Sequence, residues 1–206
     1  MKRSTAFLLT DAMEDVITKG TGTSASLASG MTAAGKSGTT TNNYDYWFSG
    51  YTPYHTASVW MGYDRNTDFD SNDLHKKIWS KIMDKISTTK NEKKISFKKP
   101  SSIVTANVCK KSGKLAIDGV CDHDPRGNMI VTEYFEKGTV PTQTCDTHVA
   151  VEICKKSDSL ANKHCPEKYR KQKVYIVRQK NSPGITADTP YLLPEKYRNQ
   201  VCKAHK

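Results

Sequence analysis

The sequence predicts an α+β protein in which a helix, three antiparallel strands and a second helix precede a small cysteine-rich extension. Two stretches with apolar residues at helical spacing predict the helices. A run of aromatic and β-branched residues between turns predicts the strands, and six cysteines that all follow position 100 mark the extension. With 206 residues, 36% of them hydrophobic, the chain has enough apolar material to bury a core.

The first helix is expected to begin near Ser4, a residue type that caps helices, and to end at Gly20. Its apolar residues recur at helical spacing: Phe7, Leu8, Met13, Val16 and Ile17. The second helix is expected after a cap at residues 71–73. A broad apolar face of this helix is expected to cover the strands: Leu74, Ile78, Trp79, Ile82, Met83 and Ile86.

Between the helices, the small residues of 20–35 predict a loop, and the aromatic-rich residues of 39–63 predict strands. Turn residues at 42–43 and 52–53 leave short connections, which favour an antiparallel meander. Large aromatic side chains on strands are more often buried than exposed, so we expect Trp47 and Tyr51 to pack in the core.

The net charge of +11 is unevenly distributed. Residues 1–75 hold 5 basic and 8 acidic side chains, whereas residues 76–206 hold 27 and 13, so we expect two domains, 1–88 and 89–206, with a hydrophilic linker at 88–101. The lysines are scattered and no nucleic-acid motif accompanies them, so nucleic acid is not an expected partner. The chain also lacks an apolar run of about 18 residues and a signal peptide, which predicts a soluble chain without its own export signal.

Two motifs overlap at residues 30–38. Residues 30–37 match the phosphate-binding pattern GxxxxGK[ST], but that site needs a buried strand before the loop and a helix after it. Residues 24–29 are too polar for such a strand, and residues 38–43 are poor material for a first helical turn. We therefore favour a strand that carries Lys36-Ser37-Gly38, where a cation and a hydroxyl bind a substrate carboxylate and glycine permits close approach.

The sequence around this tripeptide resembles the transpeptidase domain of class A penicillin-binding proteins, the bifunctional peptidoglycan synthases of the bacterial cell surface. Residues 34–40, 47–53 and 59–64 resemble three consecutive strands of that domain. Residues 5–11 and 20–23 resemble its preceding helix and loop, and Ile78, Trp79 and Met83 resemble its closing helix. Residues 113–116 and 133–141 resemble the extension of many Gram-positive members, as far as about His148.

The resemblance implies a partial β-lactamase-like transpeptidase domain, from a membrane-anchored extracytoplasmic protein that cross-links peptidoglycan stem peptides and is acylated by β-lactams. Lys36, Ser37, Gly38 and Thr39 would bind the substrate or β-lactam, with the Thr39 N–H as an oxyanion donor. The family's S-x-x-K nucleophile precedes this strand, whereas matches here, such as residues 96–99, follow it. We therefore expect no catalytic residue, no cofactor and no acylation by this chain alone.

The implied partners are the rest of the synthase or a second copy, because the strand near residues 59–63 would otherwise be an unpaired apolar edge. The alternative function is a non-catalytic cell-wall-binding or interaction module that keeps the scaffold without the nucleophile.

The extension contains an internal repeat. Residues 108–116 recur as residues 153–161, and each copy continues to a second cysteine and then to a C-x-x-H pair, which predicts two repeats at about 102–148 and 149–206. The even cysteine count and the outer cell surface favour disulfides, with the equivalent positions suggesting Cys121–Cys145, Cys165–Cys202 and Cys109–Cys154. Free thiols and a Cys₃His zinc site per repeat are the alternatives, but without a C-x-x-C knuckle we expect no metal.

Overall fold

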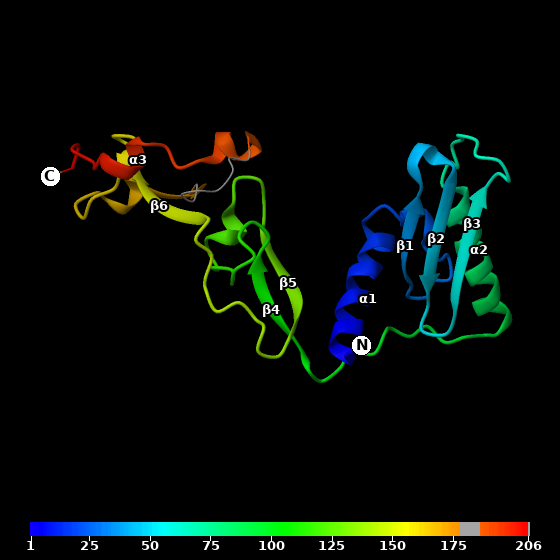
Figure 1. The fold of residues 1–206 in the computed structure, drawn as a ribbon. Coiled ribbons are helices and arrows are strands. Elements are labelled where there is room, and N and C mark those ends of the chain that lie inside the picture. Colours follow the sequence, from blue (N-terminus) through cyan, green and yellow to red (C-terminus); the bar gives the residue numbers. More distant parts are fainter. Residues whose placement is uncertain (178–185, 206) are drawn as a thin grey trace. The chain divides into compact units, whose positions relative to one another are not determined.

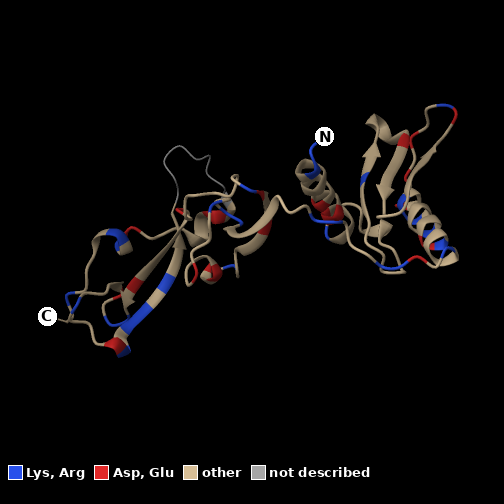
Figure 2. Ribbon diagram, turned by 90° about the horizontal axis from the view of Figure 1, so that it is seen from below, with Lys and Arg blue, Asp and Glu red and all other residues tan. Residues whose placement is uncertain are grey.

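The structure, a computed structural model, describes residues 1–177 and 186–205. The chain divides into two compact units, Met1–Ile103 and Val104–Lys206 (Figure 1). No helix in the described part of the chain is both long and apolar enough to cross a membrane. Figure 2 shows Lys and Arg along helix α2 (Leu74–Thr89) and through the second unit, with acidic residues among them.

The first unit contains a three-stranded antiparallel sheet in the order β1-β2-β3. The strands are β1 (Ala34–Thr39), β2 (Asp45–Tyr51) and β3 (Thr56–Gly62). Lys36 pairs with Ser49, and Trp47 pairs with Trp60. The α+β meander predicted from the sequence is confirmed. Because Lys36, Ser37 and Gly38 lie inside β1 and not at the start of a helix, a phosphate-binding loop is excluded at this position.

Two helices flank this sheet, α1 (Arg3–Thr18) and α2 (Leu74–Thr89). Helix α1 packs beside β1, and α2 packs against β2 and β3 (Figure 1). The predicted cap at Ser4 is wrong, because Ser4 is buried inside the first helical turn. Helix α2 begins directly after Asp73 as expected, but the Asp73 carboxylate accepts hydrogen bonds from Ser24 (2.7 Å) and Lys76 (2.6 Å) in place of the helix N–H groups.

Phe48 and Trp79 form the centre of the first unit's core. Both side chains are fully buried, and their rings meet edge to face with centroids 5.0 Å apart. A Cβ atom at Gly50 would lie 2.7 Å from the Trp79 ring, so this glycine allows the indole to reach the sheet. The expectation for Trp47 is wrong, because neighbouring strand residues point to opposite faces and Trp47 is 44% exposed.

The buried face of α2 is narrower than the sequence suggested. Trp79 and Met83 face the core, whereas Leu74, Ile78 and Ile82 are 45%, 36% and 44% exposed. The sheet is only three strands wide, so α2 covers it with a single stripe of side chains and leaves the next stripe outside.

Residues 88–101, expected as a linker, make several contacts with the first unit. The Tyr54 hydroxyl donates to the Lys93 carbonyl (3.1 Å), and His55 Nε2 lies 2.5 Å from the Glu92 carboxylate. The Tyr51 and Phe97 rings pack edge to face with centroids 5.4 Å apart. The division between the units accordingly falls after Ile103.

The second unit contains two small sheets. One pairs β4 (Ile103–Cys109) with β5 (Ile130–Glu136). The other has the order β7-β6-β8, from β6 (His148–Cys154), β7 (Ser159–Leu160) and β8 (Arg170–Ile176). A short helix, α3 (Lys196–Asn199), follows. Cysteines form a buried cluster in each half, and the strands also bury Val108, Ile153, Val174 and Ile176.

Candidate functional site

The backbone of β1 presents hydrogen-bonding groups at the edge of the first sheet. The Thr40 N–H donates to the Asp45 carbonyl on the neighbouring strand (3.1 Å). Backbone groups of an antiparallel strand alternate between its two sides, so the N–H groups of Ser37 and Thr39 point away from β2. The Lys36 ammonium donates to the Ser37 carbonyl (2.9 Å), which fits a carbonyl directed outward. No strand pairs with this outer edge among the described residues.

The side chains of the same segment combine a cation with two hydroxyls. Lys36, Gly38 and Thr39 are exposed, and Ser37 is half-buried. Ser37 and Thr39 lie two residues apart on one face of β1 and line a cavity of about 430 Å³. The cavity is also lined by Tyr46, residues 70–73 and the first turn of α2. Lys36 is not among its lining residues, because neighbouring residues of a strand point to opposite faces.

His75 lines this cavity and was not identified from the sequence. It is 2% exposed, and neither ring nitrogen has a hydrogen-bond partner among the described residues. Burial, and then the nearby Lys76 ammonium, hold the pKa of His75 below its usual value, so the imidazole is neutral at neutral pH. A single histidine in a helical segment gives no sequence signal that it will be buried in a cavity wall.

The cysteines do not form the predicted disulfides. All six are buried free thiols, and they form two separate clusters. Within each cluster, the possible ligand atoms lie within 4.8 Å of one another. Cluster 1 consists of Cys109, Cys121, Cys145 and His148, and cluster 2 consists of Cys154, Cys165, Cys202 and His205. The cross-repeat pair Cys109–Cys154 is wrong because each repeat folds around its own cysteines. The pairs Cys121–Cys145 and Cys165–Cys202 are cluster neighbours, but their thiols are free.

In cluster 1 the histidine is fixed on both sides. His148 Nδ1 lies 3.4 Å from the Cys109 sulfur and 3.4 Å from the Cys145 sulfur. Its Nε2 lies 2.8 Å from the Asp124 carboxylate, and both side chains are fully buried. Arg126 donates to Asp124 from its backbone N–H (2.8 Å), Nε (2.9 Å) and Nη2 (2.8 Å). Burial opposes ionisation of Asp124, but these hydrogen bonds outweigh it and lower the pKa of that carboxyl.

The thiols of cluster 1 differ in acidity. Burial raises the pKa of Cys121 to about 12. Burial also acts on Cys145, but hydrogen bonds with Ser112 and His148 outweigh it and lower the pKa of Cys145 to about 6. These hydrogen bonds favour the ionised form of Cys145, and a thiolate is the form of cysteine that binds metals and attacks electrophiles.

Cluster 2 has the same inventory with different surroundings. His205 Nδ1 lies 3.5 Å from the Cys154 sulfur and 3.6 Å from the Cys202 sulfur. The Asn162 N–H donates to the Cys165 sulfur (3.3 Å), and its side-chain amide donates to the Cys202 and His205 carbonyls (2.8 Å each). The Tyr169 ring stacks on His205 with centroids 5.2 Å apart.

The two clusters are built by equivalent hydrogen bonds, so the sequence echo between residues 108–116 and 153–161 corresponds to a structural repetition. In each, a residue with positive φ follows the first cysteine and closes a turn onto its carbonyl: Gly113 to Cys109 (2.8 Å) and Asp158 to Cys154 (2.9 Å). In each repeat a backbone N–H donates to the sulfur of the second cysteine: Ile117 to Cys121 (3.3 Å) and Asn162 to Cys165 (3.3 Å). The N–H of the third cysteine donates to a leucine carbonyl: Cys145 to Leu115 (2.8 Å) and Cys202 to Leu160 (2.8 Å).

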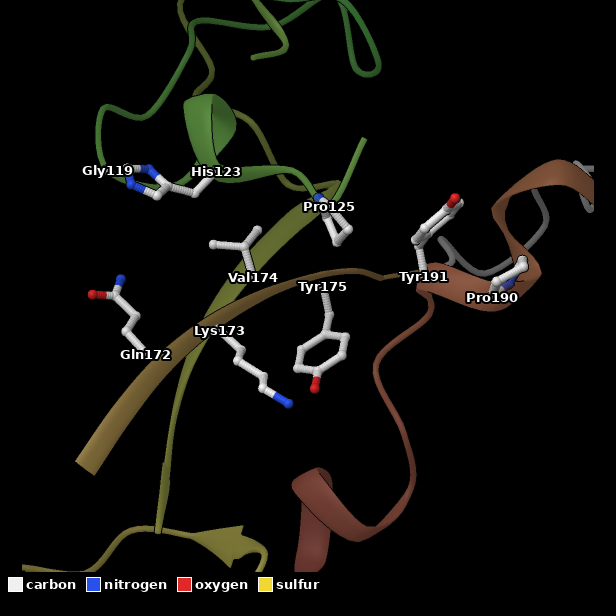
Figure 3. Close-up of a pocket in the computed structure, with 9 residues that line it drawn as sticks. All are labelled: Gly119, His123, Pro125, Gln172, Lys173, Val174, Tyr175, Pro190 and Tyr191. Atoms are coloured by element: carbon white, nitrogen blue, oxygen red, sulfur yellow. The ribbon is translucent and has the colours of Figure 1, made fainter. Parts of the chain in front are cut away.

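A second cavity, of about 660 Å³, lies within the second unit (Figure 3). Figure 3 shows His123 and Pro125 on one side, and Tyr175 of β8 and Tyr191 on the other. Nearby, Arg126 pairs with Asp188 (2.6 Å) and lies over the Tyr191 ring (4.9 Å). Arg126 therefore orients Asp124 and also holds the segment around Asp188 against cluster 1.

Comparisons with known proteins identify the family. Residues 1–84 match the penicillin-binding protein transpeptidase domain, and residues 99–150 match the C-terminal domain of penicillin-binding protein 1A. The chain belongs to the penicillin-binding protein family. The resemblance inferred from the sequence is thus confirmed, and the second match ends close to the expected His148. Residues 151–206, which contain cluster 2, lie outside both matched ranges.

Individual relatives extend this result. The chain is 35% identical to penicillin-binding protein 1A of Clostridium botulinum over 92% of its length, and 33% identical to that of Clostridium novyi over 97%. It is similar in structure to penicillin-binding protein 1A from Haemophilus influenzae, with a TM-score of 0.53 and 25% identity over 70% of this chain and 22% of that one. The chain spans 23% of the length of each clostridial relative.

Proposed function

We propose that this chain forms the carboxylate-binding wall of a serine D,D-transpeptidase that cross-links peptidoglycan stem peptides and is acylated by β-lactams. The observation that carries the proposal is the placement of Lys36, Ser37 and Thr39 along an exposed sheet edge. The Lys36 ammonium supplies positive potential, and the Ser37 and Thr39 hydroxyls donate to the substrate carboxylate.

The backbone of the same edge supplies a further group. The outward Thr39 N–H acts as one donor of the oxyanion hole, a contact worth about 3 kcal/mol of the barrier. The nucleophile and its base belong to S-x-x-K and S-x-N segments in another part of a membrane-anchored, extracytoplasmic synthase. The chain alone therefore does not become acylated.

We place further strands of that synthase at the outer edge of β3, on the side of the sheet opposite the β1 edge that faces the nucleophile. No strand pairs with this edge in the described part of the chain, and Trp60 and Tyr63 near it are 46% and 58% exposed. An unpaired apolar edge associates with other strands, so the isolated chain is expected to self-associate through it.

A fluorescent penicillin tests the site. The full-length gene product should be labelled covalently and the isolated chain should not. Lys36→Ala removes a charge-assisted contact worth about 1.5–3 kcal/mol, which slows acylation by about 10- to 150-fold. Lys81→Ala, at an exposed lysine on α2, is the matched control and should acylate at the parental rate.

Two results would reject the proposal. Labelling of the isolated chain would show that it has its own nucleophile. An unlabelled full-length product would favour the non-catalytic wall-binding alternative.

A further inference from the structure

We propose that the two cysteine clusters are structural zinc sites, each with three thiolates and one imidazole as ligands. This inference concerns the second unit and does not depend on the transpeptidase proposal. Zinc in proteins prefers four ligands from cysteine and histidine in tetrahedral geometry, and a closed set of four protein ligands is typical of structural sites. Clusters 1 and 2 each offer such a set.

Two sulfur–nitrogen distances in each cluster match those of a tetrahedral zinc site, and the other ligand atoms lie within 4.8 Å. With Zn–S of about 2.3 Å and Zn–N of about 2.0 Å, tetrahedral angles place a ligand sulfur about 3.5–3.6 Å from the ligand nitrogen. The measured sulfur–nitrogen distances are 3.4 and 3.4 Å in cluster 1, and 3.5 and 3.6 Å in cluster 2. A disulfide would instead need two sulfurs about 2.05 Å apart.

Hydrogen bonding alone does not account for four converging groups. A neutral imidazole has one nitrogen that accepts, and in cluster 1 the other nitrogen is engaged by Asp124. His148 Nδ1 therefore offers one lone pair to two equidistant sulfurs, with the Cys121 thiol also within 4.8 Å. A cation at the centre satisfies all of these groups at once.

The surroundings of cluster 1 are those of a metal-bound histidine. Ligating imidazoles donate their second N–H to a carboxylate or carbonyl, which fixes the tautomer and orients the ligand nitrogen. Asp124 plays this part for His148, and Arg126 holds Asp124 in place. The Ile117 N–H donates to the Cys121 sulfur (3.3 Å), so this sulfur already accepts a hydrogen bond from the backbone beside the cluster.

In cluster 2 the backbone N–H of Asn162 donates to the Cys165 sulfur at the equivalent position. The Asn162 side chain ties the segment that carries Cys202 to the end that carries His205. The ligand donors therefore belong to one preformed local structure.

Metal content of the intact 206-residue chain tests the inference. Protein purified in the presence of reductant and Zn²⁺, then dialysed against metal-free buffer, should retain two zinc ions per chain by native mass spectrometry. Its six thiols should react with a thiol reagent only after a strong chelator removes the metal. Replacement by Co²⁺ should give thiolate-to-cobalt charge transfer and the intense visible bands of tetrahedral coordination.

Variants assign the ions to the two clusters. His205→Ala should reduce the content from two zinc ions to one, whereas His164→Ala, at an exposed histidine of the same repeat, should keep two. His148→Ala should also retain one ion, and His148→Cys, which restores a fourth zinc ligand, should retain two. Because each variant leaves the other cluster intact, the count is informative even where one repeat loses its structure.

Three outcomes would overturn the inference. They are fewer than one zinc ion per chain after dialysis, two ions retained by both His148→Ala and His205→Ala, and intramolecular disulfides in the native protein by non-reducing peptide mapping.

Discussion

The two units of this chain are held together by different chemistry. In the first, a sheet and a helix bury Phe48, Trp79 and Met83 in an apolar core. In the second, the buried cluster at the centre of each half consists of cysteines, and Val108, Ile153 and Ile176 are also buried. The first unit relies on burial of apolar area, whereas on the zinc proposal the second unit also gains folding free energy from the metal that its thiols bind.

The unfolding of the two units can be followed by separate spectroscopic signals. All three tryptophans, Trp47, Trp60 and Trp79, lie in the first unit, so tryptophan fluorescence reports on that unit alone. Backbone amide signals of residues 104–177 report on the second.

Removal of zinc should give the largest effect. Zinc binding contributes about 10–16 kcal/mol of folding free energy in small zinc-dependent domains, so a strong chelator should unfold the second unit. Amide signals from residues 104–177 should collapse to unfolded positions in NMR spectra, while tryptophan fluorescence stays unchanged. Readdition of Zn²⁺ should restore the signals. A second unit that stays folded without metal would mean that its buried apolar side chains suffice.

Truncation of the apolar core should have the next largest effect, and only on the first unit. Trp79→Ala removes a fully buried indole and should lower the free energy of unfolding of that unit by about 3–5 kcal/mol. Trp60→Ala is the matched control, because Trp60 is 46% exposed and should cost about 1 kcal/mol or less. Urea titrations followed by the remaining tryptophans measure both.

Zinc content should stay at two ions per chain in both tryptophan variants. A loss of zinc in Trp79→Ala would contradict the independence of the two units.

Much of the fold followed from the sequence, and the failures have identifiable causes. Turn residues and aromatic runs predicted the meander, and Lys36-Ser37-Gly38 lies on a strand as expected. Trp47 and Phe48 are adjacent aromatics on one strand, and the alternation of strand faces allows only one of them into the core. Composition alone does not say which. Similarly, the apolar residues of α2 cover more of its circumference than three strands can bury.

The cysteines were misread for a different reason. Disulfides and zinc sites both require cysteines that converge in space, so spacing along the chain does not distinguish them. What favours zinc over disulfides is the distance from the cysteine sulfurs to Nδ1 of His148 and His205, and only the folded structure gives these distances. His75 was missed because only the folded chain brings it to a cavity that Ser37, Thr39 and Tyr46 also line.

The smallest expected effect is a pH dependence of the free energy of unfolding of the first unit. It arises from His75, which belongs to that unit. The folded-state pKa of His75 is lowered, by burial first and by the Lys76 ammonium next, with Asp73 acting in the opposite sense. A histidine with a lowered pKa stabilises the fold above its unfolded value of about 6.5, and that contribution is lost as pH falls.

His75→Phe keeps a ring against Tyr46, whose centroid is 5.4 Å from the His75 ring, and removes the titrating group. The parent should lose first-unit stability between pH 7 and pH 5 in urea titrations followed by tryptophan fluorescence, because the unfolded chain then binds a proton that the folded chain takes up less readily. The variant should lose less, because it leaves the contact between His55 and Glu92 unchanged and removes only the His75 imidazole. Equal pH dependence in the two proteins would show that His75 gains its proton without cost, in which case its unpartnered nitrogens face water and not a dry cavity wall.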